Sequence, residues 1–400
     1  MIARAAPRRR LRVAFLHPEL GLGGAERLVV DAAIELGQRG HEVVLYTAAH
    51  DPARAFPETV DGRLVVRVRG AFLPRRIAGR LQTVCTIARV SWIAARVVAE
   101  RFDVVVSDLV PYAMPLLRAL DRGRAKLVYY CHYPDQLLAP PRRGLYRLYR
   151  APLDRLELPA MRAADRVVVN SRFTAGVLER LGGLRAAVVY PGVDVGAYAD
   201  IPEPPPGEAV ILVVSRFDRR KNLPLIILAL AELKAREPSL YATVRLVIAG
   251  GLDPKRGEDA AVARELETLA ARLGVAERLI LERSPSDARR LELLAQARCV
   301  VHAAPDEHFG LVPVEAMASG RPVVAVDAAG PLETIVDGVT GFLRPPTAVA
   351  FAEAIGKLVS DRDAAARMGR AGRLHAARFS RRAFGDALED LLVRLCEGDA

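Results

Sequence analysis

The sequence predicts an α/β protein built from two doubly wound domains, each a parallel sheet covered by helices on both faces. From Leu11 onward, short apolar runs alternate with amphipathic stretches, which is typical of such sheets. The chain has 400 residues, which exceeds the size of one hydrophobic core. Residues 199–207 hold four prolines and are predicted to form a stiff linker between the two domains.

The elements follow in order along each half. In the first half we expect a helix over residues 24–37 and strands over 12–16, 42–46, 65–68, 103–107, 127–131, 166–170 and 187–190. In the second half we expect helices over 348–360 and 381–396 and strands over 209–214, 244–249, 279–281, 300–303 and 323–326.

These elements predict two domains, residues 11–198 and 208–377. A final helix, about 380–398, is expected to pack back on the first domain. Two such domains facing each other would leave a cleft lined by the carboxyl ends of the strands, where ligands bind in open α/β sheets.

The composition points to a globular protein of the cytoplasm. Hydrophobic residues make up 51% of the chain and charged residues 26%. The four cysteines have no metal-ligand spacing, so reduced thiols are expected. The basic start at residues 1–10 precedes an apolar run, 11–16, that is too short for a signal peptide. No apolar stretch reaches the ~18 to 20 residues of a transmembrane helix.

The net charge of +11 comes mainly from arginine, and its distribution leaves two interpretations open. Arginines interleave with apolar residues over 75–101 and again, with two tyrosines, over 142–150. These segments could form a basic amphipathic surface on anionic lipid. They could equally be core helices with solvated arginine faces. We expect no nucleic-acid partner, because no recognisable reading module is present.

A glycine-rich turn joins the first predicted strand to the first predicted helix. Gly23 and Gly24 lie in this turn and would let the backbone approach a phosphate. A dinucleotide site needs a third glycine where Glu26 stands, and an acidic residue after the second strand, where residues 46–48 read Tyr-Thr-Ala. An oxidoreductase is therefore disfavoured.

Two glutamates flank a predicted helix start in the second half. Pro313 is tolerated only in a first helical turn, so the helix should run from about Leu311 to Gly320, with Glu307 before it and Glu315 one turn inside. Free amides near Gly310 and Leu311 would attract an anion, and the carboxylates would accept hydrogen bonds from sugar hydroxyls.

A pair of cations follows the first strand of the same half. Arg216 and Lys221 would suit a diphosphate, with the guanidinium forking two oxygens and the ammonium acting as a point charge. Each pair has an ordinary structural explanation on its own: a charged loop, or a surface glutamate and a helix-dipole glutamate. Together the four residues predict a pocket for a nucleoside-diphosphate sugar.

With these motifs, the chain resembles the retaining glycosyltransferases of family 4, which have the GT-B fold of two Rossmann-like domains. Glu307 and Glu315 match the family's paired glutamates, Arg216 and Lys221 its diphosphate clamp, and Gly24 the backbone that closes over the diphosphate. The resemblance implies that Glu307 holds the transferred sugar and Glu315 the ribose. His132 matches a histidine beside the transferred sugar.

Within the family, the resemblance is narrower. The motifs at residues 17–27, 130–135, 148–152, 307–317 and 329–333 resemble those of the α-1,3/1,6-mannosyltransferases of lipid-linked oligosaccharide assembly. That similarity implies GDP-mannose as donor, a polyprenyl-diphosphate oligosaccharide as acceptor, and transfer with retention.

We expect neither a metal nor another cofactor, because no Asp-x-Asp motif follows a strand and Asp361-Arg362-Asp363 falls in a helical region. The alternatives are a sugar-nucleotide epimerase or glycoside-processing enzyme on the same fold, or a non-catalytic sugar-nucleotide-binding or scaffold protein.

Overall fold

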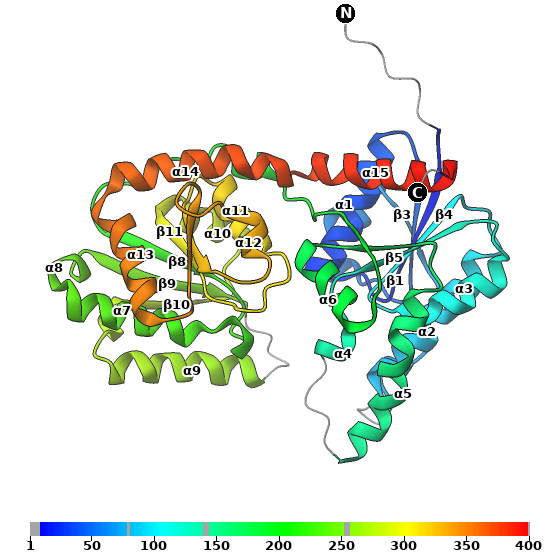
Figure 1. Cartoon of the computed structure of the whole chain (residues 1–400), viewed down its shortest axis with the longest axis horizontal. Coiled ribbons are helices and arrows are strands. Elements are labelled where there is room, and N and C mark those ends of the chain that lie inside the picture. Colours follow the sequence, from blue (N-terminus) through cyan, green and yellow to red (C-terminus); the bar gives the residue numbers. More distant parts are fainter. Residues whose placement is uncertain (1–8, 78–80, 139–143, 252–256, 399–400) are drawn as a thin grey trace, which may run out of the picture. The chain divides into compact units, whose positions relative to one another are not determined.

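The computed structural model describes residues 9–77, 81–138, 144–251 and 257–398 (Figure 1). Arg80, Arg142 and Arg143 of the arginine-rich segments lie outside these ranges. The chain divides into two compact units. The first unit combines Met1–Gly192 with Arg381–Ala400, and the second is Val193–Ser380.

The first unit contains a seven-stranded parallel sheet of order β3-β2-β1-β4-β5-β6-β7. Its strands are β1 (Arg12–His17), β2 (Glu42–Thr47), β3 (Val65–Val68), β4 (Val104–Asp108), β5 (Lys126–Cys131), β6 (Arg166–Val169) and β7 (Ala187–Val188). Strand β7 is shorter than predicted and ends at Val188.

Helices cover both faces of this sheet, because alternate residues of each strand point to opposite sides. On β1, Val13 and Phe15 pack with helices α1 and α15, whereas Ala14 and Leu16 pack with α2, α3 and α6. The helices are α1 (Gly24–Gln38), α2 (Gln82–Val97), α3 (Met114–Asp121), α4 (Asp135–Leu138), α5 (Gly144–Met161), α6 (Arg172–Gly182) and α15 (Arg381–Glu397). Leu388 and Leu392 of α15 are buried beside α1 in this core.

The second unit contains a six-stranded parallel sheet of order β10-β9-β8-β11-β12-β13. Its strands are β8 (Ala209–Val214), β9 (Val244–Gly250), β10 (Leu279–Arg283), β11 (Ala297–His302), β12 (Val323–Val326) and β13 (Gly341–Arg344). We did not expect β13, whose four residues contain an apolar run of only two, Phe342 and Leu343.

The helices of the second unit again lie on both faces. Helices α7, α9 and α13 form one core with the sheet, while α10, α11 and α14 contact β8 or β11. They are α7 (Leu223–Arg236), α8 (Pro238–Tyr241), α9 (Gly257–Arg272), α10 (Asp287–Gln296), α11 (Leu311–Ala318), α12 (Pro331–Thr334), α13 (Ala348–Ser360) and α14 (Arg362–Ala376).

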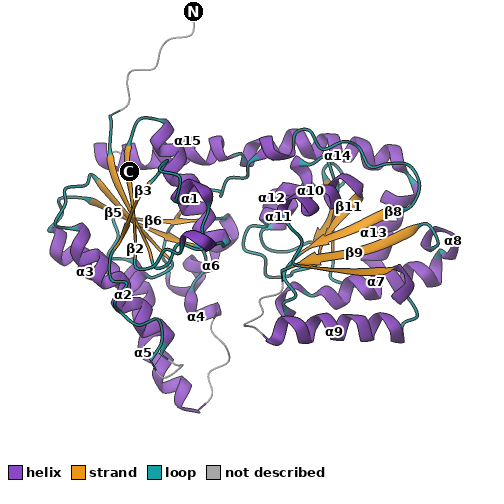
Figure 2. Ribbon diagram, turned by 180° about the vertical axis from the view of Figure 1, so that it is seen from behind, coloured by secondary structure: helices purple, strands orange, loops and turns teal. Residues whose placement is uncertain are grey.

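Both sheets reverse their strand order beside the first strand of the unit. Figure 2 shows β9, β8 and β11 side by side in the second sheet. In the first sheet the reversal lies between β1 and β4, and in the second between β8 and β11. At such a point the loops after two neighbouring strands run to opposite sides, which leaves room for a ligand. The residues that follow β1, β4, β8 and β11 are therefore placed to contact a ligand.

The structure does not place the proline-rich segment, residues 199–207, between the two units, where the prediction had a stiff linker. It belongs to the second unit, where arginines of that unit bind its carbonyl groups. Arg373 donates to the carbonyls of Ala199 and Ile201 at 3.1 and 2.9 Å, and Arg362 donates to that of Pro204 at 2.6 Å. Proline-rich backbone offers unpaired carbonyls, and these guanidinium groups satisfy them.

The division between the units falls at Val193, ahead of the predicted domain end at residue 198. The amide of Val193 donates to the carbonyl of Phe379 at 2.8 Å, which ties this segment to the second unit. Tyr198, which follows, is buried in the same unit.

Candidate active site

Lys221 and Glu307 meet at the reversal point of the second sheet. Lys221 ends a short 3₁₀ turn after β8, and Glu307 lies in the loop between β11 and α11. Nζ of Lys221 donates to Oε2 of Glu307 at 2.7 Å, and Nε2 of His302, the last residue of β11, lies 3.2 Å from the same oxygen. Burial alone would raise the pKa of Glu307, but His302 and Lys221 hold that pKa well below its ordinary value. The carboxylate is ionised and ready to accept hydrogen bonds.

A close backbone contact fixes the loop that carries Glu307. The amide of Gly330 donates to the carbonyl of Glu307 at 2.8 Å. A Cβ atom at Gly330 would lie 2.4 Å from the carbonyl oxygen of Phe309, so only glycine permits this approach. The Ala-Gly-Pro-Leu-Glu motif at residues 329–333 thereby positions the glutamate loop.

Helix α11 begins at Leu311, as predicted, with Pro313 in its first turn. Gly310 is the N-cap, with φ of +91°, a conformation that favours glycine. The amides of the first helical turn have no intrahelical hydrogen-bond partner. No side chain caps them either, and Pro313 contributes no N–H. They form a positively polarised end next to Glu307.

Glu315 lies one turn inside α11 and is held by two residues that the sequence did not reveal. Tyr198 and Arg290, the latter on α10, are its hydrogen-bonding and charged partners. Burial raises the pKa of Glu315, and Arg290 and Tyr198 partly oppose that rise. No local pattern links these residues, because they meet only when α10 and the segment after Val193 pack against α11.

Arg216 is separate from this cluster. Its side chain is 53% exposed and its ion pair is with Asp218, at 3.7 Å. Asp218 in turn accepts a hydrogen bond from the amide of Arg220 at 3.0 Å and caps the turn that carries Lys221. The structure thus brings Lys221 to Glu307 and leaves Arg216 outside the cluster, on the loop after β8.

His17, which we had not singled out, ends β1 at the reversal point of the first sheet, and His132 directly follows β5, the strand on the other side of β4. Asp108 at the end of β4 lies between them. Its carboxylate oxygens are 2.8 and 2.9 Å from Nδ1 of His17, and Oδ2 is 3.2 Å from Nε2 of His132. His17 and Asp108 are almost completely buried, so this is an enclosed chain of two imidazoles and one carboxylate.

Gly23 and Gly24 form the start of α1, as the sequence indicated. Gly23 is the N-cap, in extended conformation, and its carbonyl accepts from the amide of Arg27 at 2.9 Å. A Cβ atom at Gly23 would lie 2.2 Å from Oε2 of Glu26, so the absence of a side chain leaves room for that carboxylate. Nothing lies within 4 Å of a Cβ built at Gly24.

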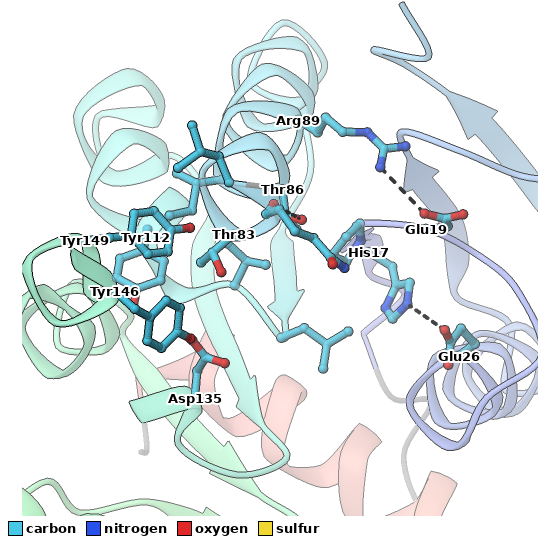
Figure 3. A pocket seen from close by; sticks show the side chains of 16 residues that line it. His17, Glu19, Glu26, Thr83, Thr86, Arg89, Tyr112, Asp135, Tyr146 and Tyr149 are labelled. Carbon is cyan, nitrogen blue, oxygen red and sulfur yellow. Dashed lines mark hydrogen bonds and ion pairs between the residues drawn. The ribbon is translucent and has the colours of Figure 1, made fainter. Parts of the chain in front are cut away.

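A pocket of about 900 Å³ opens in the first unit beside His17 (Figure 3). Three tyrosines gather at one end, and His17 with Glu26 lies at the other. Its polar lining consists of His17, Glu19, Glu26, Gln82, Thr83, Thr86, Arg89, Tyr112, Asp135, Tyr146 and Tyr149. Aromatic rings with nearby carboxylates, hydroxyls and an amide are the usual partners of sugar rings and their hydroxyl groups.

Two arginines of the proposed lipid surface are buried, so that interpretation is wrong for them. Arg89 on α2 is 3% exposed and lies 3.6 Å from Glu19. Arg150 on α5 is 2% exposed, with Asp135 at 2.7 Å and Asp154 at 2.8 Å. Their side chains turn inward because each finds carboxylates there.

The other arginines of these segments that the structure describes remain on the surface. Arg75 pairs with Glu19 at 2.6 Å. Arg96 lies over the ring of Trp92 at 4.5 Å. Phe72, Ile77 and Leu148 are exposed nearby in the sequence.

Two Rossmann-like units with charged and imidazole side chains at the ends of their central strands define a class, the glycosyltransferases of GT-B fold. The model described as "Glycosyltransferase Family 4" matches residues 22–197, and that described as "Glycosyl transferases group 1" matches residues 197–375. Among solved structures, the sucrose-phosphate synthase from Thermosynechococcus elongatus superposes with a TM-score of 0.77 at 23% identity, covering 97% of this chain and all of the other.

The chain belongs to glycosyltransferase family 4. It is 40% identical to the alpha-1,3/1,6-mannosyltransferase ALG2 of Homo sapiens, over 96% of each chain. It is 37% identical to the enzyme of the same name from Rhizomucor pusillus, over 96% of this chain and 92% of that one. The predicted fold class and enzyme class are confirmed.

Proposed function

We propose that this glycosyltransferase moves mannose from GDP-mannose onto a glycan carried by a polyprenyl diphosphate, with release of GDP. The observation that carries the proposal is the ionised Glu307 held by Lys221 and His302 at the reversal point of the second sheet. The choice of mannose is supported by relatives whose names state mannosyl transfer at up to 40% identity.

The leaving diphosphate would be stabilised by Lys221, Arg216 and the amides at the start of α11. Negative charge grows on the diphosphate as the glycosidic bond breaks, and fixed donors aimed at that charge lower the barrier. Arg216 is exposed enough to reach a ligand, and Lys221 lies next to Glu307. In the proposal, the backbone at Gly23 and Gly24 approaches the same diphosphate.

The sugar and the ribose would be held by carboxylates. Glu307 accepts hydrogen bonds from hydroxyls of the mannose, with His132 beside it, and Glu315 accepts them from the ribose. In this proposal the acceptor attacks from the face of the leaving group, so the configuration is retained, and the β-phosphate takes the acceptor's proton. The glutamates then bind rather than act as the acid and nucleophile of a hydrolase.

The proposal includes no metal or other cofactor, because Lys221 and Arg216 supply the positive charge. In the part of the chain that the structure describes, no group of three or more His, Cys, Asp or Glu side chains is arranged to hold a metal ion.

Nucleotide release tests the proposal. The enzyme is incubated with GDP-mannose, UDP-glucose or UDP-N-acetylglucosamine, each with and without a phytanyl-diphosphate-linked glycan acceptor. We expect GDP release from GDP-mannose that depends on the acceptor, and the anomeric configuration of the product, read by NMR, to match that of the donor. Tight donor binding without release under all conditions would favour a non-catalytic sugar-nucleotide-binding protein instead.

We further propose that the enzyme works in the cytoplasm, in peripheral contact with anionic lipid. No helix among the described residues is long and apolar enough to cross a membrane. Exposed Phe72, Ile77 and Leu148 accompany exposed Arg75 and Arg147 in the first unit, which suits insertion of apolar side chains among anionic headgroups.

Flotation with vesicles of phosphatidylcholine and phosphatidylglycerol tests this contact. Binding should weaken in high salt and in Leu148→Asp. Leu374→Asp is a matched control, since Leu374 is an exposed leucine of the second unit. No flotation at low salt, or equal effects of both substitutions, would contradict the proposal.

A further inference from the structure

The pocket of the first unit contains a gap of defined size between two charged side chains. Nε2 of His17 lies 4.0 Å from Oε1 of Glu26, and both residues line the pocket. This distance is too long for a direct hydrogen bond. It does match one bridging hydroxyl group, because an oxygen atom can lie about 2.8 Å from both atoms at once.

The chemistry of the two groups also fits a hydroxyl. Nδ1 of His17 faces the carboxylate of Asp108 at 2.8 Å, so Nδ1 carries a proton. Burial alone would lower the pKa of His17, but Asp108, Glu26 and the backbone at Glu19 raise it overall, which favours a proton on Nε2 as well. His17 can therefore donate to the hydroxyl oxygen while Glu26 accepts the hydroxyl proton.

The position of His17 links the pocket to the transferred sugar. Asp108 contacts both His17 and His132, and His132 is the residue that the family resemblance places beside that sugar. The carboxylate of Asp108 therefore connects His17, at the inner end of the pocket, to His132 and the expected position of the transferred sugar. The tyrosines at the far end, including Tyr112 and Tyr146, offer ring faces for further sugar units (Figure 3).

Two buried polar atoms of the same pocket have no hydrogen-bond partner among the described residues. They are the hydroxyl of Tyr149 and Nε of Arg89. Such groups are costly to bury without a partner. Both residues belong to the polar lining of the pocket, which suits a polyhydroxylated ligand better than a hydrocarbon chain.

We propose that His17 and Glu26 are acceptor-binding residues that hold one hydroxyl of the acceptor glycan between them, and that Asp108 is the positioning residue for His17. This inference rests on the proposed function for the identity of the acceptor. The second unit, which carries the donor-binding glutamates, takes no part in it.

The test compares acceptor kinetics with donor kinetics. His17→Gln and Glu26→Gln should each raise the KM for the phytanyl-diphosphate-linked glycan about tenfold to a hundredfold, as loss of one hydrogen bond to a charged group does. The KM for GDP-mannose should stay within about twofold. An unchanged acceptor KM, or an equal rise in the KM for GDP-mannose, would overturn the proposal.

His41→Gln is the matched control. His41 is also a buried histidine of the first unit beside a carboxylate, with Nε2 at 3.2 Å from Glu389, but it does not line the pocket. His41→Gln therefore measures how the loss of a buried histidine–carboxylate pair outside the pocket affects the acceptor KM. If His41→Gln raised the acceptor KM as much as His17→Gln, the effect would be structural and the proposal would fail.

Two NMR measurements on the intact chain separate this proposal from the proposed function. The charged and titratable groups that face His17 are Asp108 from β4 and Glu26 from α1, with His132 behind Asp108. Asp108→Asn should lower the measured pKa of His17, and an unchanged pKa would remove its positioning role.

Titration with methyl α-mannopyranoside and with chitobiose should shift the imidazole signals of His17 but not those of His41. If the enzyme releases no GDP yet the sugar shifts His17, the proposed function fails and the acceptor site stands. If GDP is released but neither sugar shifts His17 at tens of millimolar, the acceptor site is wrong.

Discussion

Nζ of Lys221 lies 2.7 Å from Oε2 of Glu307, although 86 positions separate the two residues in the chain. One follows β8 and the other follows β11, the two strands at which the order of the second sheet reverses. A cation and an ionised carboxylate therefore share one place, as the proposed site for a nucleoside-diphosphate sugar requires.

Removing either partner should abolish transfer. We expect Lys221→Ala and Glu307→Ala to lower kcat by about a hundredfold or more, the usual cost of losing one preorganised charge-stabilising group. Lys234→Ala, at a half-exposed lysine of the same unit, should leave kcat unchanged. Steady-state GDP release measures all three, and circular dichroism confirms folding. Wild-type activity in Glu307→Ala would remove the site assignment.

Arg290 should support Glu315 both in folding and in donor binding. Arg290→Met leaves the carboxyl of Glu315 without its cation, so we expect a loss of about 1–3 kcal/mol in the free energy of unfolding and a raised KM for GDP-mannose. Arg289→Met, on the same helix, breaks ion pairs with the partly exposed Glu282 and the exposed Glu292 and should cost at most about 1 kcal/mol. Urea unfolding distinguishes them, and equal losses would contradict the role of Arg290.

The stability of the first unit should depend on pH through His17. The pKa of His17 is raised in the fold, with burial opposed by Asp108, so its contribution is complete below the unfolded value of about 6.5. That contribution is lost as the pH rises through the folded pKa. Asp108 behaves in the opposite sense, because its pKa is lowered despite burial, and its contribution is lost as the pH falls below about 4.

The measurement is urea unfolding at pH 6 and pH 9. Wild-type protein should lose more stability between these values than His17→Gln, whose side chain does not titrate. Identical pH dependence in both proteins would show that His17 has an ordinary pKa in the fold.

Gly330→Ala should disturb the loop of Glu307 without touching the ligand directly. The new methyl group would meet the backbone of Phe309 at 2.4 Å, so the loop must shift. We expect the free energy of unfolding to fall by about 1–3 kcal/mol because of overpacking. We also expect a lower kcat, measured at saturating GDP-mannose. Gly37→Ala, in a helix with nothing within 4 Å, should be neutral or stabilising. Normal kinetics in Gly330→Ala would show that the loop adapts.

Chelation should leave the reaction intact if Lys221 and Arg216 stabilise the diphosphate without a metal. We expect GDP release after dialysis against EDTA to match the untreated rate, and added Mg²⁺ or Mn²⁺ to change it less than about twofold. Loss of activity in EDTA that Mn²⁺ restores would show that the reaction requires a metal ion, contrary to the proposal.

The sequence by itself determined the fold class and most of the strands. Parallel strands buried on both faces appear as short continuous apolar runs, and the carboxyl ends of such strands are where polar motifs gather. Glu307, Lys221 and the start of α11 at Leu311 could therefore be predicted from local pattern and spacing. The expected roles of these residues came from the family resemblance, because the sequence pattern alone does not assign them.

Only the tertiary structure decided which side chains turn inward and which partners they meet. Arg89 and Arg150 had the pattern of a basic surface, yet both are buried beside carboxylates. His17 shares Asp108 with His132 because β1, β4 and β5 lie side by side in the sheet, although they are far apart in the chain. The preference of a segment for helix or strand depends on its neighbours along the chain. Ion pairs, buried hydrogen bonds and pockets depend instead on which distant segments pack together.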